Sequence, residues 1–134
     1  MPDPFGYSGK PLIRKLGLKD FQVLKPIAAP EAHADWIEPL PVGAVVDPAA
    51  AQADLVHLFV PDRADLERGA GPALAAVKPG GMLWVSWPKK TSPLFRDLTE
   101  DGLREVLLPT GWVDVKVCAV SADWSGLKFL KRRP

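Results

Sequence analysis

Val77-Lys78-Pro79-Gly80-Gly81-Met82-Leu83-Trp84-Val85-Ser86-Trp87-Pro88-Lys89-Lys90 is the stretch that decides the fold. A helix is predicted to end at its first residue, Val77, and the two glycines are predicted to form the turn that follows. The apolar run Met82–Trp87 predicts a central strand buried on both faces, as in the interior of a parallel sheet. Because Trp84 and Trp87 have an odd separation, their side chains are predicted to lie on opposite faces of that sheet.

The segment before this stretch supplies a second strand and a helix. Asp54–Val60 is another near-continuous apolar run, which predicts a buried strand. Asp62 is placed to cap the helix that follows. Gly69, Gly71 and Pro72 predict that this helix is broken into two pieces.

The segment after the stretch supplies a helix and a hairpin. The helix runs through Leu108, with Asp97 or Thr99 as its cap. Trp112–Val120 alternates apolar and polar residues over its middle, which predicts a half-exposed strand. A tight loop then leads to Ser125–Leu130, so the two segments predict an antiparallel hairpin.

The first third of the chain carries weaker signals. Pro11–Leu16 predicts a short helix, and Phe21–Leu24 predicts a strand cut off by Pro26. Pro30–Leu40 predicts a helix that further prolines stop. Together the elements predict an α/β fold: a mostly parallel sheet with helices on both faces, right-handed crossovers and a C-terminal antiparallel hairpin.

This order of elements resembles the second half of class I S-adenosylmethionine-dependent methyltransferases. In that family an Asp-Leu-Val strand and a helix precede a Pro-Gly-Gly turn, a strand, a helix and a closing hairpin. Asp54-Leu55-Val56 and Val77-Lys78-Pro79-Gly80-Gly81 stand at the matching places. The resemblance covers about residues 54–131 and implies a truncated, Rossmann-like methyltransferase fold.

The front half departs from that family. Methyltransferases have a glycine-rich turn after the first strand, where the backbone passes close to the cofactor. The corresponding turn here is Pro26-Ile27-Ala28-Ala29-Pro30, which has no glycine and two prolines that donate no N–H. Asp47 matches the acid that binds the cofactor ribose, yet no room is left before Asp54 for the family's third strand. We therefore expect no S-adenosylmethionine cofactor.

Nearly the whole chain is similar to a small bacterial family of unknown function. The motifs that carry this resemblance are Gly9-Lys10-Pro11-Leu12, Trp84-Val85-Ser86-Trp87-Pro88-Lys89-Lys90, Val113-Asp114-Val115-Lys116-Val117-Cys118-Ala119-Val120 and Trp124-Ser125-Gly126-Leu127-Lys128-Phe129. The resemblance implies the same truncated fold and brings no established activity.

Length, net charge and cysteine content limit which partners and locations are expected for this protein. The 134 residues predict one domain, with residues 1–20 as an N-terminal arm and short helix. A net charge of +1 gives no reason to expect nucleic acid or membrane as a partner. Cys118 is the only cysteine, so no intrachain disulfide forms. With no long apolar span and no secretory signal, a cytoplasmic location is expected.

Four residues form the predicted ligand site. Ligands of open parallel sheets bind beyond the carboxyl ends of the strands. Arg63, Lys89 and Lys90 follow two such ends and are predicted to converge on an anionic ligand, with Trp87 as a stacking face. The alternative is that the lysines are solvated loop residues and Trp87 packs in the core.

A second possible binding face lies on the hairpin and consists of Lys116, Trp124 and Lys128. Asp114 and Lys116 are predicted to share one face of their strand. The alternative is that these charges form cross-strand pairs or guard a sheet edge.

The remaining reactive residue types predict no chemistry. His57 is interpreted as a hydrogen-bonded core residue, His33 as a surface residue and Cys118 as an inert thiol. No metal site and no catalytic residue is predicted, because ligand-spaced histidines and nucleophile motifs are absent.

The function favoured by these observations is a non-catalytic, cytoplasmic binding module for an anionic small molecule or a protein partner. One alternative is a methyltransferase with an atypical cofactor site, and another is a subunit whose hairpin edge serves assembly alone. The sequence leaves the oligomeric state open.

Overall fold

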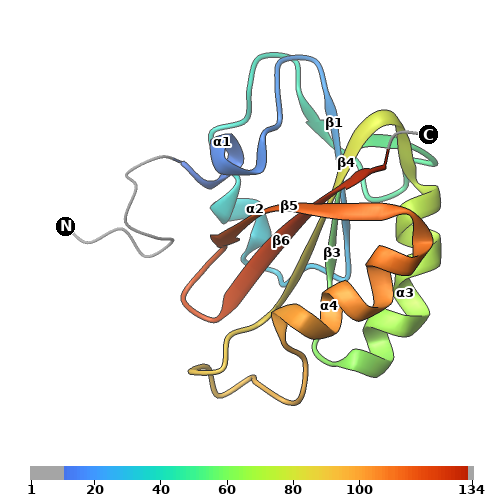
Figure 1. The fold of residues 1–134 in the computed structure, drawn as a ribbon. Coiled ribbons are helices and arrows are strands. Elements are labelled where there is room, and N and C mark those ends of the chain that lie inside the picture. Colours follow the sequence, from blue (N-terminus) through green and yellow to red (C-terminus); the bar gives the residue numbers. More distant parts are fainter. Residues whose placement is uncertain (1–10, 133–134) are drawn as a thin grey trace.

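The computed structural model describes residues 11–132, which form one six-stranded sheet with helices on both faces (Figure 1). The strands are β1 (Val23–Ile27), β2 (Val45–Val46), β3 (Ala53–Phe59), β4 (Val77–Pro88), β5 (Trp112–Ala119) and β6 (Trp124–Lys131). The helices are α1 (Leu12–Leu16), α2 (His33–Trp36), α3 (Arg63–Ala75), α4 (Glu100–Leu107) and the 3-10 turn η1 (Leu108–Thr110). No helix in this part of the chain has the length and apolar character needed to cross a membrane.

The strand order is β2-β1-β3-β4-β6-β5. The first four strands in this order pair in parallel, β6 runs antiparallel to β4, and β5 runs antiparallel to β6. This confirms the predicted mostly parallel α/β sheet with a C-terminal antiparallel hairpin.

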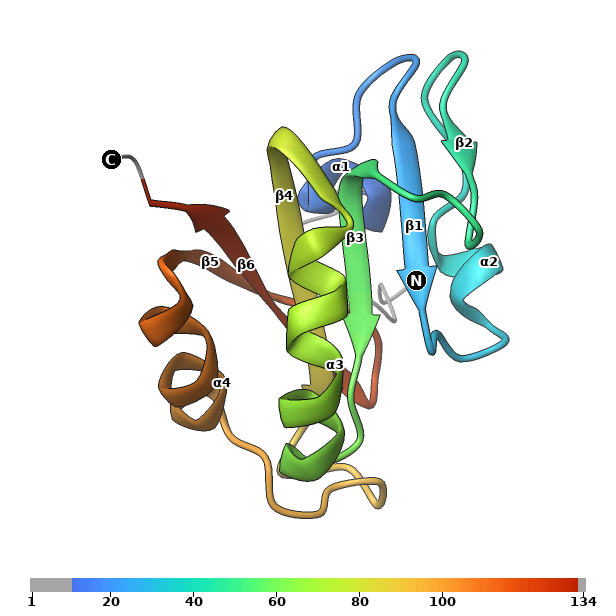
Figure 2. The ribbon, with the colours of Figure 1, turned by 90° about the vertical axis from the view of Figure 1, so that its right-hand side faces the viewer.

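Two apolar layers enclose the sheet. The α3/α4 face packs its helices through residues such as Leu66 and Leu103, and the α1/α2 face packs through residues such as Leu16 and Ile37 (Figure 2). Trp87 belongs to the first layer, and Trp84 belongs to the second, where its Nε1 donates a hydrogen bond to the carbonyl of Leu16 at 2.8 Å. The prediction that the two indoles lie on opposite faces is confirmed.

Gly80 and Gly81 lie inside β4, at a bulge near its start, so the prediction that they form a turn before the strand is wrong. The helix α3 ends at Ala75, and β4 already pairs at Val77, so the predicted helix end was two residues too late. The register with β3 then shifts before Met82. Gly80 has φ of +82°, and a Cβ on Gly81 would lie 2.7 Å from the carbonyl oxygen of Asp54, so other residues would be strained here.

The helix α3 is continuous, so the predicted break is wrong. Pro72 lies inside it, on the side exposed to solvent, and the carbonyl that its ring frees belongs to the exposed Arg68. Water can therefore satisfy that carbonyl, while Leu66, Ala70 and Ala73 hold the opposite side of the helix in the core.

Pro26 does not end β1, contrary to prediction. The carbonyls of Gln22 and Leu24 accept hydrogen bonds from Val45 N in β2 and from Asp47 N directly after it, so alternate residues along β1 direct their backbone toward that strand. Pro26 has the same orientation but lies beyond the end of β2. Its missing N–H therefore removes no bond of the sheet.

The predicted helix Pro30–Leu40 is reduced to the single turn of α2. Pro39 disfavours helical geometry at the preceding residue, Glu38, so the turn cannot extend. The short helix is held to the sheet by contacts such as that of the His33 ring with His57 in β3.

Candidate functional site

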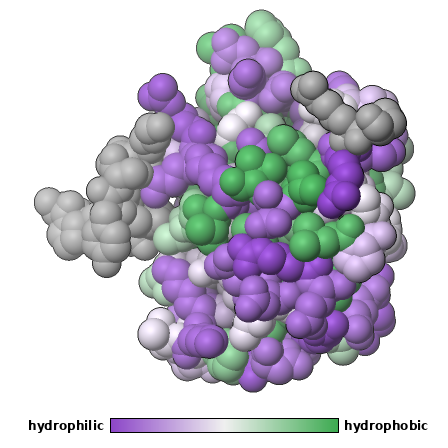
Figure 3. All heavy atoms as spheres, viewed as in Figure 1, coloured by the Kyte–Doolittle hydropathy of each residue, from purple (hydrophilic) through white to green (hydrophobic). Residues whose placement is uncertain are grey.

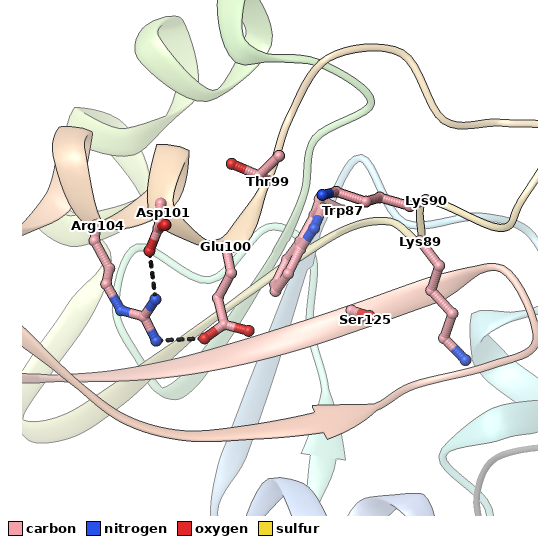
Figure 4. Close-up of a pocket in the computed structure, with 8 residues that line it drawn as sticks. All are labelled: Trp87, Lys89, Lys90, Thr99, Glu100, Asp101, Arg104 and Ser125. Atoms are coloured by element: carbon pink, nitrogen blue, oxygen red, sulfur yellow. Dashed lines mark hydrogen bonds and ion pairs between the residues drawn. The ribbon is translucent and has the colours of Figure 1, made fainter.

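A pocket of about 460 Å³ opens at the carboxyl end of β4, and we call it the β4-end pocket (Figure 4). It lies between the loop after β4, the start of α4 and the neighbouring strand β6. Its lining residues are Trp87, Lys89, Lys90, Thr99, Glu100, Asp101, Arg104 and Ser125.

The loop that carries the two lysines is tied to the tip of the hairpin. The backbone N–H of Lys89 donates to the carbonyl of Asp123 at 2.8 Å, and the Ser92 hydroxyl donates to the Asp123 carboxylate at 2.8 Å. The backbone of Lys89 is thereby held beside the end of β6. Ser125 reaches the same pocket because it pairs with Trp87 across the β4–β6 ladder.

Arg104 forms ion pairs with the acidic side chains that line the pocket. Its guanidinium donates to Asp114 at 3.0 Å, to Asp101 at 2.9 Å and to Glu100. The hydrogen bond to Asp114, followed by the one to Glu100, raises the pKa of Arg104 above its already high value. Both acids that line the pocket are therefore already paired with a cation.

The two lysines have no such partner. Within residues 11–132, neither ammonium forms an ion pair or a side-chain hydrogen bond. Figure 4 shows the side chain of Lys90 extending toward Trp87 and Thr99, while Lys89 points away from them. The pocket therefore holds one inward cation and a second at its mouth, with their charges not neutralised by the described residues.

Trp87 and Thr99 shape the pocket wall. Trp87 is only 6% exposed, so most of its indole packs in the α3/α4 face and only an edge is available to a ligand. The Thr99 hydroxyl accepts a hydrogen bond from Gly102 N at 3.2 Å and so caps α4. The first backbone N–H groups of α4 have no partner inside the helix and lie at this end of the pocket.

Arg63 does not line the β4-end pocket. Its guanidinium donates to Glu105 at 2.5 Å and to Glu67 at 3.5 Å, and the hydrogen bond to Glu105 raises its pKa. Arg63 thus ties α3 to α4, so the structure brings Lys89 and Lys90 into one pocket without the third cation. Sequence reasoning missed Arg104 and Ser125, whose places depend on the helix and strand that pack beside β4.

The second predicted face is divided by a β-bulge at Val115. Asp114 pairs with Arg104 on the α3/α4 face, whereas the Lys116 ammonium donates to the carbonyl of Lys15 at 3.3 Å on the α1/α2 face. The prediction that Asp114 and Lys116 share a face is therefore wrong, because the extra residue reverses the alternation. Lys116 lies opposite Lys128.

Trp124 lies apart from those lysines, at the start of β6. Its ring packs against Phe59 with centroids 5.2 Å apart. It is four residues from Lys128, which along a strand corresponds to about 13 Å. The structure therefore joins Lys116 with Lys128 and leaves Trp124 in the aromatic cluster at the strand ends.

Two histidines are buried beside that cluster. His57 is fully buried, and its Nε2 lies 2.7 Å from the Ser86 hydroxyl, so the interpretation of a hydrogen-bonded core residue is confirmed. His33 is 4% exposed, with its ring centroid 5.4 Å from that of His57, so the predicted surface position is wrong. The single turn of α2 lays this ring onto β3.

Burial also sets the charge of these rings. It lowers the pKa of His33 to about 4 and, with a smaller contribution from the charge of His33, lowers the pKa of His57 well below 6.5. Both rings are neutral near pH 7. The Ser86–His57 contact resembles a nucleophile–base pair, but both side chains are inaccessible to a substrate.

The region where a methyltransferase would hold its cofactor differs from that family in its turn and in the environment of its acid. An apolar pocket of about 600 Å³ lies beyond β1 and β3 and includes Ala28, Phe59 and Trp124 in its lining. Ala28 adopts φ of +57° in the turn, which lacks the family's glycines. Asp47 is exposed and accepts a hydrogen bond from Ala49 N at 3.0 Å, which occupies one of its oxygens locally.

Residues 11–132 also contain no cluster of metal-ligating side chains. Among residues 11–132, no group of three or more His, Cys, Asp or Glu residues is arranged to hold an ion. Burial raises the pKa of the Cys118 thiol, although Lys15 and Lys116 act in the opposite direction, so the reactive thiolate is disfavoured.

The chain matches no protein-family model and no curated protein sequence. It is similar in structure to a ribosomal protein L11 methylase from Lactobacillus delbrueckii subsp. bulgaricus, with TM-score 0.60 and 9% identity over 91% of this chain and 75% of that one. It is also similar to 1,6-didemethyltoxoflavin-N1-methyltransferase from Burkholderia thailandensis, with TM-score 0.59 and 12% identity over 92% and 78% of the two chains. A third such structure is a methyltransferase described as putative from Thermoplasma acidophilum, with TM-score 0.56 and 9% identity over 87% and 70%. Identities this low show the fold alone, and that fold is the Rossmann-like fold of the class I methyltransferases.

Proposed function

We propose that this chain is a non-catalytic, cytoplasmic binding module that holds an anionic small molecule in the β4-end pocket. One observation carries the proposal: Lys89 and Lys90 line one pocket and have no acid partner among residues 11–132, while its acids Glu100 and Asp101 are paired with Arg104. We also propose that the chain belongs to the small bacterial family that its sequence motifs resemble.

The chemistry of the lining suits a phosphate or a carboxylate. An anion in the pocket would be attracted by the Lys90 ammonium inside it and by the Lys89 ammonium at its mouth. Hydrogen bonds from ammonium to phosphate or carboxylate are charge-assisted and are about twice as strong as neutral ones. The Ser125 hydroxyl and the first N–H groups of α4 add neutral donors, and the helix dipole favours a negative ligand at that end.

An active methyltransferase is the second candidate, and only the likeness in fold favours it. The turn after β1 and the local hydrogen bond of Asp47 argue against the cofactor. The binding function therefore accounts for more of the observed geometry.

Thermal unfolding in the presence of phosphate tests the proposal. Binding to the folded state raises the melting temperature with ligand concentration. We expect phosphate, compared with chloride at equal ionic strength, to stabilise the wild type and the control variant Lys131→Ala/Arg132→Ala, which removes two exposed cations at the other end of the sheet. The variant Lys89→Ala/Lys90→Ala should keep its fold and lose the response. An equal response in all three proteins would refute an anion site at this pocket.

A further inference from the structure

A second group of cations lies on the α1/α2 face, and we call Lys19, Lys116 and Lys128 the basic cluster. Lys116 and Lys128 lie opposite each other on β5 and β6. The Lys128 ammonium is 3.9 Å from where a Cβ on Gly17 would stand, which places it at the C-terminal end of α1. Burial lowers the pKa of Lys128, and the charges of Lys116 and Lys19 lower it further.

No acid neutralises this cluster within residues 11–132. None of its three ammonium groups forms an ion pair with a carboxylate there, although Lys116 donates to the carbonyl of Lys15. Carbonyl oxygens at the end of α1 stabilise the cations only in part. The cluster therefore keeps a positive field that a negatively charged partner would relieve.

The cluster borders an open edge of the sheet. The strand β5 is the last in the sheet order, and Figure 1 shows it in front of β6. Arg132 N donates to Gly111 O, and Val120 N donates to Trp124 O. With the register and the alternation of an antiparallel pair, these bonds direct the backbone groups of Val117 and Ala119 away from β6.

Apolar side chains flank the same edge. Val115 and Val117 are each 52% exposed. Figure 3 shows hydrophobic residues gathered in the middle of this side of the molecule, next to hydrophilic ones. Val117 pairs with Leu127 and so lies on the α3/α4 face, whereas Lys116 lies on the α1/α2 face.

We propose that the edge of β5 binds an extended peptide as an added strand, and that this peptide alternates acidic and apolar side chains. Successive side chains of a strand point to opposite faces. One face of the added strand would meet the field of the basic cluster, and the other would meet Val117. Its backbone would pair with the outward groups of Val117 and Ala119, as in other cases of strand addition.

Two other occupants fit less well. A second copy paired through β5 would bring two basic clusters together, and the bulge at Val115 interrupts the long regular edge that such pairing needs. Nucleic acid would meet the lysines but would use neither the exposed valines nor the outward backbone groups. The observations therefore favour an acidic peptide.

The test uses a fluorescein-labelled eight-residue peptide of alternating glutamate and valine, titrated with the full chain at low salt and followed by anisotropy. A peptide of alternating lysine and valine has the same pattern with the opposite charge and should not bind. Val117→Pro removes an outward donor without removing a bond to β6, and Lys116→Glu reverses one charge of the cluster. Each should weaken binding about tenfold or more. Lys25→Ala, which removes a cation on β1 near the opposite edge of the sheet, should bind like the wild type.

Several outcomes would overturn the proposal. These are failure of the wild type to bind the acidic peptide, undiminished binding by a folded Val117→Pro variant, and equal binding of the lysine peptide. Tighter binding of an oligothymidine would assign the face to nucleic acid, and a dimer in sedimentation that Val117→Pro abolishes would assign it to a second copy. If Val117→Pro fails to fold by circular dichroism, the test rests on Lys116→Glu and Val117→Thr, since neither alters backbone pairing. Undiminished binding by both variants would then overturn the proposal.

Discussion

Residues 11–52 and residues 53–132 form one sheet, but they are stabilised in different ways. The second region has a 13-residue helix and a 12-residue strand, and its helices α3 and α4 are capped by the side chains of Asp62 and Thr99. The first region has helices of five and four residues without a side-chain cap, and strands of five and two residues. Helices shorter than about 12–15 residues are marginal in isolation, so the first region depends on contacts with the second.

Three contacts make that dependence specific. Trp84 Nε1 donates to the carbonyl at the end of α1. The Asp54 carboxylate accepts from Val23 N at 2.8 Å, at the start of β1. The ring of His33 in α2 packs against His57 in β3. Breaking each contact tests whether the first region takes its shape from the second.

Removing the indole of Trp84 should have the largest effect. This side chain is fully buried, so Trp84→Ala should lower the free energy of unfolding by about 3–5 kcal/mol. Trp84→Phe keeps most of the ring but loses the bond to Leu16, and should cost about 1–3 kcal/mol. Urea unfolding followed by circular dichroism measures both. Equal losses in the two variants would mean that the hydrogen bond, rather than ring volume, carries the contact.

Acid should destabilise the protein through the histidines. In the folded state the pKa of His33 is lowered from 6.5 to about 4, so the unfolded chain binds the proton more readily. Stability from this residue is therefore fully present above pH 6.5 and is lost as pH falls toward about 4, with a total of about 3 kcal/mol. Urea unfolding at pH 7 and pH 4.5 gives the difference.

The variant His33→Leu isolates that contribution. The difference in its free energy of unfolding between the two pH values should be smaller than that of the wild type, because the contribution of His33 is removed. The difference that remains comes from His57 and the carboxylates. A difference as large as that of the wild type would show that His33 is accessible to protons in the folded state.

Asp54→Asn should have a smaller effect. Burial disfavours the Asp54 carboxylate, but hydrogen bonds from Val23 N and Lys78 more than offset this, so its pKa is lowered. The amide keeps one acceptor and loses the charge, so we expect a loss of about 1 kcal/mol in urea unfolding. Lys78→Met removes the half-exposed ion pair alone and should cost less. A larger loss for Lys78→Met would make the ion pair, not the bond to β1, the important contact.

The smallest expected effect is that of S-adenosylmethionine. The first region lacks the glycine turn, and Ala28 occupies the left-handed conformation there. Calorimetric titration of the wild type should therefore detect no binding. A dissociation constant in the low micromolar range would contradict this and would favour the methyltransferase alternative.

The lining of the proposed ligand site was predictable only in part. Lys89 and Lys90 were identifiable as residues of the β4-end pocket because they follow a strand end, where open α/β sheets place their ligands. Arg63 follows another strand end, yet Glu105 binds its guanidinium. Glu105 is 42 residues away in sequence, and the packing of α4 on α3 decides their contact.

The sequence by itself determined most elements of the second region, although it did not show that α3 continues through Pro72. Asp62 and Thr99 cap helices, Gly111 ends the 3-10 turn with φ of +92°, and the two apolar runs form the parallel strands β3 and β4. These features depend on neighbouring residues, because caps, turns and periodicity act over a few positions.

Tertiary structure alone decided the burial of His33, the place of Pro26 inside β1, and the opposite directions of Asp114 and Lys116. Each depends on a partner distant in sequence: the ring of His57, the end of β2, or the register with β6. A local pattern cannot specify such a partner, because the same residue is stable on the surface or in the core according to what packs against it.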